Sequence, residues 1–236
     1  MCKECGCGIT NISDKKAVEV FEDILKYNKF QAKHNREHFE EHKIYAINLM
    51  SAPGSGKTTL LEKTLDLLKE KYRIGVIEGD LETERDAERI RQKGIPVYQI
   101  TTGSACHLDA ALVHKAMHHL PLDQIEILFV ENIGNLVCPS NYELGTHLNV
   151  TLLSVPEGED KPEKYPLIFK VSDVVIITKV DLLSYFNFNL QKVKEQIKKI
   201  NPYSYVISLS AKTGEGLKKW IDLIETNVNE YRQRLS

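Results

Sequence analysis

The sequence predicts an α/β fold in which helices cover both faces of a mainly parallel β-sheet, preceded by a flexible cysteine-rich tail. Short apolar runs alternate along the chain with segments of helical periodicity. These runs, for example residues 127–130 and 174–177, are apolar at every position rather than at alternate ones. Strands of that kind are buried on both faces, which is typical of parallel sheets that lie between two helical layers.

The chain divides into three parts, which together suit one large domain with a small appendage. Residues 1–13 are rich in glycine and cysteine without apolar periodicity, and we expect a flexible metal-binding tail there. Residues 14–43 are expected to be an N-terminal helical segment, in which Val18, Phe21 and Leu25 share one face. Residues 44–236 are expected to form the main domain.

Strands and helices alternate within the main domain. Strands are predicted at residues 44–50, 74–77, 97–100, 126–130, 150–155, 174–178 and 205–209. Helices are predicted at residues 58–71, 83–93, 108–118, 190–200 and 217–231. In the last helix an apolar residue recurs every three or four positions, so one side of it is expected to face the core: Leu217, Ile221, Ile224 and Val228.

Composition limits the function classes. The net charge of −2 gives no basis for a general affinity for nucleic acid or an anionic membrane. No stretch approaches about 20 apolar residues and the N-terminus has no apolar signal core, so we expect a soluble, cytoplasmic protein. Five cysteines in such a chain indicate metal or redox chemistry rather than disulfides.

A phosphate-binding loop follows the first predicted strand. Residues 51–59 read Ser-Ala-Pro-Gly-Ser-Gly-Lys-Thr-Thr, with Ser51 where the usual pattern has glycine. The glycines let backbone amides face a phosphate, Lys57 reaches the β- and γ-phosphates, and the Thr58 hydroxyl holds Mg²⁺. The flanking strand and helix disfavour the alternative, a chance Gly/Ser turn. The nucleotide-binding residues expected in this P-loop NTPase fold are Gly54, Ser55, Gly56, Lys57, Thr58 and Thr59.

Two clusters near the C-terminus predict a guanine site. The Asp181 carboxylate can accept hydrogen bonds from N1–H and the 2-amino group of guanine, which adenine does not offer. Lys179 is placed to cover the base with its aliphatic stem, and Thr178 stands where the common Asn-Lys-x-Asp motif has asparagine. The second cluster is Ser210, Ala211 and Lys212, with the Ala211 N–H facing the guanine oxygen. A solvated Lys/Asp turn is the alternative for the first cluster alone.

Acidic residues at two other strand ends are candidate Mg²⁺ partners. Asp80 and Glu131 follow predicted strands, and Mg²⁺ prefers oxygen ligands, so either one suits the ion alongside Thr58. Plain strand-terminal carboxylates are the alternative, and the sequence does not rank the two. The expected catalytic residues are Lys57, Thr58 and Asp80. No glutamine or arginine stands out as an aid to hydrolysis, which favours slow intrinsic turnover.

Two groups of cysteines are candidate metal sites. Cys106 and His107, with the distant Cys138, offer two thiolates and an imidazole, a set that suits Zn²⁺ or Ni²⁺. We expect Cys106 at the start of a helix, which favours its thiolate. On spacing alone, two unrelated buried cysteines and a surface histidine remain the better interpretation. A fourth ligand from water or a second chain would complete the site.

The N-terminal Cys-x-x-Cys-x-Cys motif places three thiolates within a few residues. Cys2, Cys5 and Cys7 can wrap one ion, and the terminal amine as fourth donor would suit Ni²⁺. A zinc clip, an Fe–S fragment or a redox role are the alternatives.

Histidines recur four residues apart in two places. They are His34, His38 and His42 in the N-terminal segment, and His114 and His118 in the main domain. This spacing puts each set on one side of a helix. Solvated surface positions are the better interpretation, with metal binding as the alternative.

The combined motifs resemble the nickel-incorporation GTPases of hydrogenase maturation, the HypB family, over nearly the whole chain. The matching pieces are Met-Cys-Lys-Glu-Cys-Gly-Cys at 1–7, the phosphate loop with its flanks at 48–62, Glu-Gly-Asp-Leu-Glu-Thr at 78–83, Gly-Ser-Ala-Cys-His at 103–107, Glu-Asn-Ile-Gly-Asn-Leu-Val-Cys-Pro at 131–139, Glu-Gly-Glu-Asp-Lys-Pro at 157–162 and Thr-Lys-Val-Asp at 178–181.

The resemblance implies a SIMIBI-class GTPase that dimerises with GTP and delivers nickel to the large subunit of [NiFe] hydrogenase. It implies work with a zinc-bearing maturation partner and, in some organisms, a histidine-rich nickel-storage protein. By the family pattern Cys2, Cys5 and Cys7 match the high-affinity nickel motif. Cys106, His107 and Cys138 match a Zn²⁺ or Ni²⁺ site near the dimer interface, which reverses the interpretation from spacing. The serine at position 51 is usual in the family, whereas Thr178 departs from it.

A nucleotide-gated metal carrier is the mechanism we expect. Gly134 is placed for its N–H to sense a γ-phosphate, and Cys138 is four residues further on. One loop thus connects the two sites. The alternatives are a GTPase that serves another nickel enzyme such as urease, and a non-catalytic metal-storage protein.

Overall fold

The computed structural model describes residues 11–80, 85–103 and 105–235, with side chains from residue 18 onward except that of residue 85. Seven strands form one sheet in the order β3-β2-β4-β1-β5-β6-β7, and every neighbouring pair is parallel. The expected α/β class is therefore confirmed. Because all strands run the same way, their carboxyl ends share one edge of the sheet, where ligands bind in this class of fold.

The strands lie within three residues of the ends expected from the apolar runs. They are β1 Tyr45–Ser51, β2 Ile74–Asp80, β3 Val97–Thr101, β4 Ile127–Glu131, β5 Leu148–Ser154, β6 Val174–Thr178 and β7 Tyr205–Ser208. The largest difference is in β2, which continues through Asp80 because its backbone pairs with β3 as far as Thr101. Backbone pairing does not depend on side-chain polarity, so the apolar pattern alone ended this strand too early.

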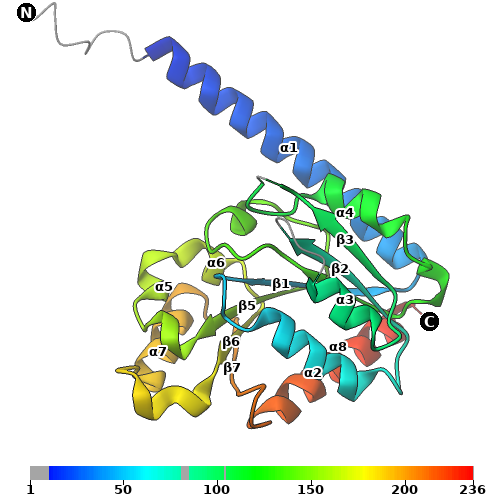
Figure 1. Ribbon diagram of the computed structural model, residues 1–236. Coiled ribbons are helices and arrows are strands. Elements are labelled where there is room, and N and C mark those ends of the chain that lie inside the picture. Colours follow the sequence, from blue (N-terminus) through cyan, green and yellow to red (C-terminus); the bar gives the residue numbers. More distant parts are fainter. Residues whose placement is uncertain (1–10, 81–84, 104, 236) are drawn as a thin grey trace, which may run out of the picture.

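Helices cover both faces of the sheet, as Figure 1 shows. They are α1 Asn11–Glu41, α2 Lys57–Leu68, α3 Arg85–Arg91, α4 Ala110–Met117, α5 Lys161–Lys164, α6 Pro166–Lys170, α7 Leu190–Ile200 and α8 Leu217–Leu235. The short helices α5 and α6 were not expected, because each is too short to show a helical period.

Separate apolar clusters fill the two faces. On one face, α2 and α8 pack through Leu61, Leu65 and Trp220, and the indole N–H of Trp220 donates to the hydroxyl of Thr64 at 2.9 Å. The buried stripe of α8 therefore includes Trp220, beside the expected Leu217, Ile224 and Val228, while Ile221 is only half-buried.

The opposite face is covered by α1 and α4 at one end and by α6 and α7 at the other. Phe39 and Met117 belong to the first cluster, and Phe169 and Ile197 to the second. The first half of α1 projects away from the sheet in Figure 1, and Val18 and Phe21 are exposed there. The apolar face expected for this helix is thus not part of the core. Within the described residues, no helix is long and apolar enough to cross a membrane.

Candidate functional site: a nucleotide pocket beside a thiolate–imidazole cluster

The phosphate loop connects the central strand β1 to helix α2. Gly54 and Gly56 adopt positive φ angles of 75° and 93°, a conformation that favours glycine. Lys57 begins α2 and is buried, with its ammonium group 3.0 Å from the hydroxyl oxygen of Ser51. Serine in place of the usual first glycine therefore gives this lysine a hydrogen-bond acceptor inside the loop.

Glu157 connects the phosphate loop to the end of β5 through hydrogen bonds. One of its carboxylate oxygens accepts hydrogen bonds from the Ser55 hydroxyl at 2.8 Å and from the backbone N–H and hydroxyl of Ser154, both at 2.7 Å. The Ser154-x-x-Glu157 pair is a capping box, a signal visible in the sequence that could have identified this residue. Its side chain fixes Ser55 and thereby helps to hold the phosphate loop in position.

Thr58 lies between two carboxylates. Its hydroxyl is 2.8 Å from Glu131 at the end of β4 and 3.0 Å from Asp86 in the first turn of α3. Asp80 lines the same cavity of about 470 Å³, as do Glu78 and Arg89. Asp86 and Arg89 were not anticipated, because they lie on a helix that the strand-end rule does not cover.

The donor set of this cavity fits Mg²⁺. Glu78 and Glu131 are neighbours on β2 and β4, and each has a buried oxygen without a hydrogen-bond partner among the described residues. Burial raises the pKa of Glu78 to about 8, with Glu131 the next cause, and raises that of Glu131 to about 7. Burial also lowers the pKa of Lys57, against the pull of these carboxylates. Crowded oxygens beside a hydroxyl are the environment that a hard divalent cation neutralises.

A second cavity of about 260 Å³ adjoins the first, and Gly56, Thr59 and Lys179 line both. Together with Lys179, its walls include the other residues expected to hold a base, Asp181, Ser210, Ala211 and Lys212, and also Ser55 of the phosphate loop. The Thr178 hydroxyl donates to the Ser55 carbonyl at 2.7 Å, and the Lys179 ammonium donates to the Gly54 carbonyl at 2.7 Å. Thr178 thus connects the segment expected to bind the base, residues 178–181, to the phosphate loop.

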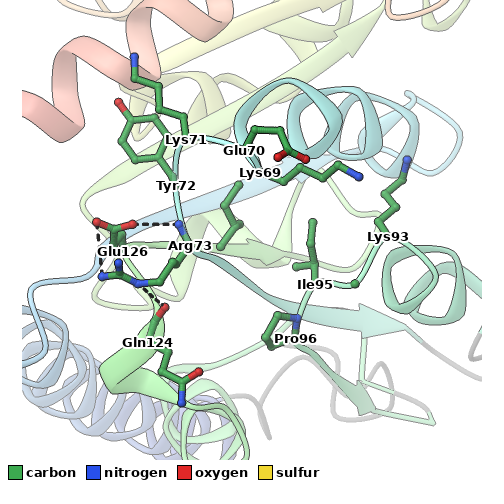
Figure 2. Close-up of a pocket in the computed structure, with 12 residues that line it drawn as sticks. Lys69, Glu70, Lys71, Tyr72, Arg73, Lys93, Ile95, Pro96, Gln124 and Glu126 are labelled. Carbon is green, nitrogen blue, oxygen red and sulfur yellow. Dashed lines mark hydrogen bonds and ion pairs between the residues drawn. The ribbon is translucent and has the colours of Figure 1, made fainter.

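A cavity of about 550 Å³, drawn in Figure 2, lies elsewhere. Its walls precede β2, β3 and β4, at the amino ends of the strands, and Arg73 donates there to the Gln124 carbonyl at 3.0 Å. Because ligands of such sheets bind at the carboxyl ends, we place the functional site in the two smaller cavities.

Cys106, His107 and Cys138 come together although the last two are 31 positions apart in the sequence. One ligand atom of each lies within 4.8 Å of the others, and the two sulfur atoms are 3.1 Å apart. Burial lowers the pKa of His107, which favours the neutral imidazole that binds metal. The hydrogen bond with Cys106 raises the pKa of Cys138. The donor set suits a borderline divalent ion and leaves room for a further ligand.

The expected helix start at Cys106 is wrong. The helix α4 begins at Ala110, where the Asp109 carboxylate caps it by accepting from the Leu112 N–H at 2.8 Å. Cys106 therefore lies in the preceding loop, outside the first turn. Cys2, Cys5 and Cys7 of the tail lie outside the described residues.

Asn132 and Gly134 connect the two sites. The buried Asn132 side chain accepts from the Leu108 N–H at 3.0 Å, and so joins the residue after Glu131 to the residue after His107. Gly134 packs against the phosphate loop so closely that a Cβ there would lie 2.9 Å from Pro53 backbone atoms.

Comparisons with known proteins agree with this geometry. Residues 45–208 match the family model described as the CobW/HypB/UreG nucleotide-binding domain. The hydrogenase maturation factor HypB of Escherichia coli K12 is 46% identical over 94% of this chain and 77% of its own length. The hydrogenase/urease maturation factor HypB of Helicobacter hepaticus is 45% identical over 90% of this chain and 88% of its own length.

A solved structure is similar as well. The crystal structure of HypB from Helicobacter pylori in complex with nickel has a TM-score of 0.83 and 42% identity, and the match covers 86% of this chain and 96% of that one. With its parallel sheet, phosphate loop and thiolate–imidazole cluster, the chain belongs to the HypB group of the CobW/HypB/UreG family of nucleotide-binding proteins.

Proposed function

We propose that the protein hydrolyses GTP and uses the nucleotide cycle to bind and release nickel during the maturation of a [NiFe] hydrogenase. Asp181 selects guanine, with the segment 210–212 around the base, and Lys57 binds the phosphates. Thr58 would hold Mg²⁺ with Glu131 and Asp80, and the ion would offset phosphate charge when bound. Cys106, His107 and Cys138 hold the Ni²⁺ cargo or Zn²⁺, and Cys2, Cys5 and Cys7 form a further nickel motif.

The main support for this proposal is the segment 131–138, because it contacts both the nucleotide pocket and the cysteine cluster. Glu131 accepts from Thr58, Gly134 packs on the phosphate loop, and Cys138 is a member of the cysteine cluster. A ligand that shifts this segment at one end therefore changes the position of Cys138 at the other. Couplings of this kind are usually about 1–3 kcal/mol, or roughly 5–150-fold in affinity, and are reciprocal.

Nickel affinity in each nucleotide state tests the coupling. We expect the affinities measured with GDP and with a non-hydrolysable GTP analogue to differ at least about fivefold. Asn132→Ala should reduce the difference, because Asn132 joins the two segments, whereas Asn141→Ala, at an exposed position of the same region, should retain it. Equal affinities in the wild-type protein would refute the coupling.

Base selectivity tests the nucleotide assignment separately. Asp181→Asn replaces an acceptor by an amide that also donates, so it should weaken GTP binding and improve binding of xanthosine triphosphate, whose base presents a carbonyl in place of the 2-amino group. Unchanged GTP preference would remove Asp181 from the base site.

The proposed partners are a second copy of the chain, a zinc-bearing maturation protein and the hydrogenase large subunit, with a histidine-rich nickel-storage protein where one is present. Dimerisation favoured by GTP would let a partner chain supply the further metal ligand, which the exposed position of Cys106 allows. Sedimentation with GDP and with the GTP analogue tests this, and an identical mass in both states would count against it.

A urease is the second candidate client, because the relative from Helicobacter hepaticus is a hydrogenase/urease maturation factor. Recovery of client proteins bound to the nickel-loaded chain distinguishes the two clients. A non-catalytic storage role predicts that Lys57→Ala leaves hydrogenase maturation intact, whereas our proposal predicts its loss.

A further inference from the structure

Helix α1 packs beside α4 on the face of the sheet away from α2 and α8 (Figure 1). Five histidines on these two helices or directly after them gather there. His34 and His38 lie one turn apart on α1, and His114 and His118 lie one turn apart at the end of α4. Ring centroids of neighbouring histidines across this group are 4.8–5.9 Å apart. The fifth, His42, is 2.8 Å from the Asp123 carboxylate and is engaged there. The two histidine sets, expected to be solvated surface positions, thus face one another.

Two buried asparagines of α1 fix the register of the helices. The amide nitrogen of Asn35 donates to the carbonyls of Ala110 at 2.8 Å and Leu144 at 3.0 Å. Asn28 donates to the Glu143 carbonyl at 2.9 Å and accepts from the Ala110 N–H at 2.9 Å. The imidazoles are therefore carried by helices that specific hydrogen bonds hold in place.

Asn35 also fixes the tautomer of His114. Because the Asn35 nitrogen faces two carbonyls, its oxygen is the atom 3.1 Å from Nδ1 of His114. An amide oxygen only accepts, so Nδ1 of a neutral His114 carries the proton and Nε2 presents a lone pair. An imidazole whose second nitrogen donates to an oxygen is the usual arrangement of metal-binding histidines.

The nitrogen positions suit a metal ion. One nitrogen each of His34, His38 and His114 lies within 4.8 Å of the others, and Nε2 of His118 is 3.3 Å from Nε2 of His114. Two nitrogens bound at about 2.0–2.1 Å to a tetrahedral ion are about 3.3 Å apart. In addition, Nδ1 of His38 is buried without a hydrogen-bond partner among the residues that the structure describes.

The surroundings favour neutral rings and an accessible ion. Burial, and then the neighbouring imidazoles, lowers the pKa of His38 and His114. His34 and His118 are exposed, which opens the cluster to solvent. A neutral imidazole set of this kind binds borderline divalent ions such as Ni²⁺ and Zn²⁺ in preference to Mg²⁺.

We propose that His34, His38 and His114, with His118 beside His114 as a further donor, form a binding site for one borderline divalent transition-metal ion, distinct from the cysteine cluster. His114 is seven residues beyond His107. His107 lies in the loop before α4 and His114 lies in the second turn of that helix, and the two groups share no residue, so they hold separate ions. This proposal does not rest on the nucleotide cycle or on the client enzyme.

Metal stoichiometry of the untagged full-length protein tests it. In a variant with all five cysteines replaced by serine, dialysis against micromolar Ni²⁺ should leave one ion per chain. Adding His38→Gln and His114→Gln should remove that ion. Adding His119→Gln should leave it, because His119 is stacked on Tyr98 outside the cluster. A folded cysteine-free protein that binds no nickel, or equal nickel binding with and without the two substitutions, would overturn the proposal.

A second measurement uses the wild-type cysteines, in case the five-serine variant fails to fold. His38→Gln with His114→Gln should lower the nickel content of otherwise wild-type protein by one ion, and His119→Gln should leave it unchanged. The X-ray absorption difference between the wild-type and double-variant samples should contain imidazole nitrogen and no sulfur. A sulfur contribution in that difference, or an unchanged nickel content, would assign the ion to the cysteines instead.

Discussion

His147, which directly precedes the strand β5, should make the stability of this protein fall as the pH is lowered. Its Nδ1 accepts from the Ala46 N–H at 3.0 Å, so the ring proton is on Nε2, which is buried without a partner in the described structure. A second proton would have to occupy Nδ1 and break that bond. Burial, and then the Arg36 and Arg234 cations, lowers the pKa of His147 to about 3.

The sign and size of the effect follow from proton linkage. An unfolded histidine has a pKa of 6.5, so between pH 6.5 and 3 the unfolded chain binds a proton that the folded chain excludes. Above pH 6.5 the ring is neutral in both states, and proton binding favours neither of them. As the pH falls below 6.5, proton binding to the unfolded chain lowers the free energy of unfolding. At pH 5, one and a half units below the unfolded pKa, the loss is about 2 kcal/mol.

Urea unfolding of the nucleotide-free protein at pH 8, 7, 6 and 5 measures it, with His147→Gln as the comparison. Glutamine retains an acceptor for Ala46 but has no proton to take up, and it should cost about 1–2 kcal/mol at pH 8 through lost ring contacts with Tyr45 and Tyr231. The wild-type advantage should shrink by about 2 kcal/mol between pH 8 and pH 5. Parallel pH profiles for the two proteins would refute the reasoning.

Three further predictions concern the nucleotide pocket. Glu78→Gln should stabilise the magnesium-free protein at pH 8, because the raised carboxyl pKa costs stability as the pH rises from 4.5 through about 8; thermal unfolding at pH 5 and 8 should show the gain only at pH 8. Gly134→Ala should weaken binding of the GTP analogue about tenfold or more and binding of GDP less, because its Cβ would meet the Pro53 backbone at 2.9 Å. Titrations of wild type and variant measure this, and an equal loss of affinity for both nucleotides would contradict it. Thr178→Val should lower stability by about 1 kcal/mol by leaving the Ser55 carbonyl without its donor, and Thr178→Ser should not; equal unfolding midpoints would remove this tie.

Local patterns in the sequence predicted most of the fold. The helix α7 begins and ends at the expected residues, and β6 does too, because their apolar periods are regular and polar residues follow. The predicted helix at 108–118 begins two residues before α4, because Asp109, a good N-cap residue, sets the start at Ala110 and leaves Cys106 in the preceding loop. The short helices α5 and α6 each have a proline in the first turn, but they are too short to show a helical period.

The sites divide in the same way. The phosphate loop and base segment are contiguous motifs, so their residues could be named from the sequence. The histidine cluster could not, because it needs α1 and α4 in one register, and Asn28 and Asn35 set that register through backbone carbonyls far along the chain. Asp86 joins the Thr58 hydroxyl only through the placement of α3. Contacts between separate helices and strands depend on tertiary packing, which local sequence patterns do not predict.

Ser51 has a consequence for the empty protein. A buried ammonium group is costly unless hydrogen bonds or opposite charges compensate it. Here the Lys57 ammonium group donates a hydrogen bond to the Ser51 hydroxyl, and a glycine at position 51 would have no side chain to accept it. We expect this contact to stabilise the phosphate loop in the interval between GDP release and GTP binding.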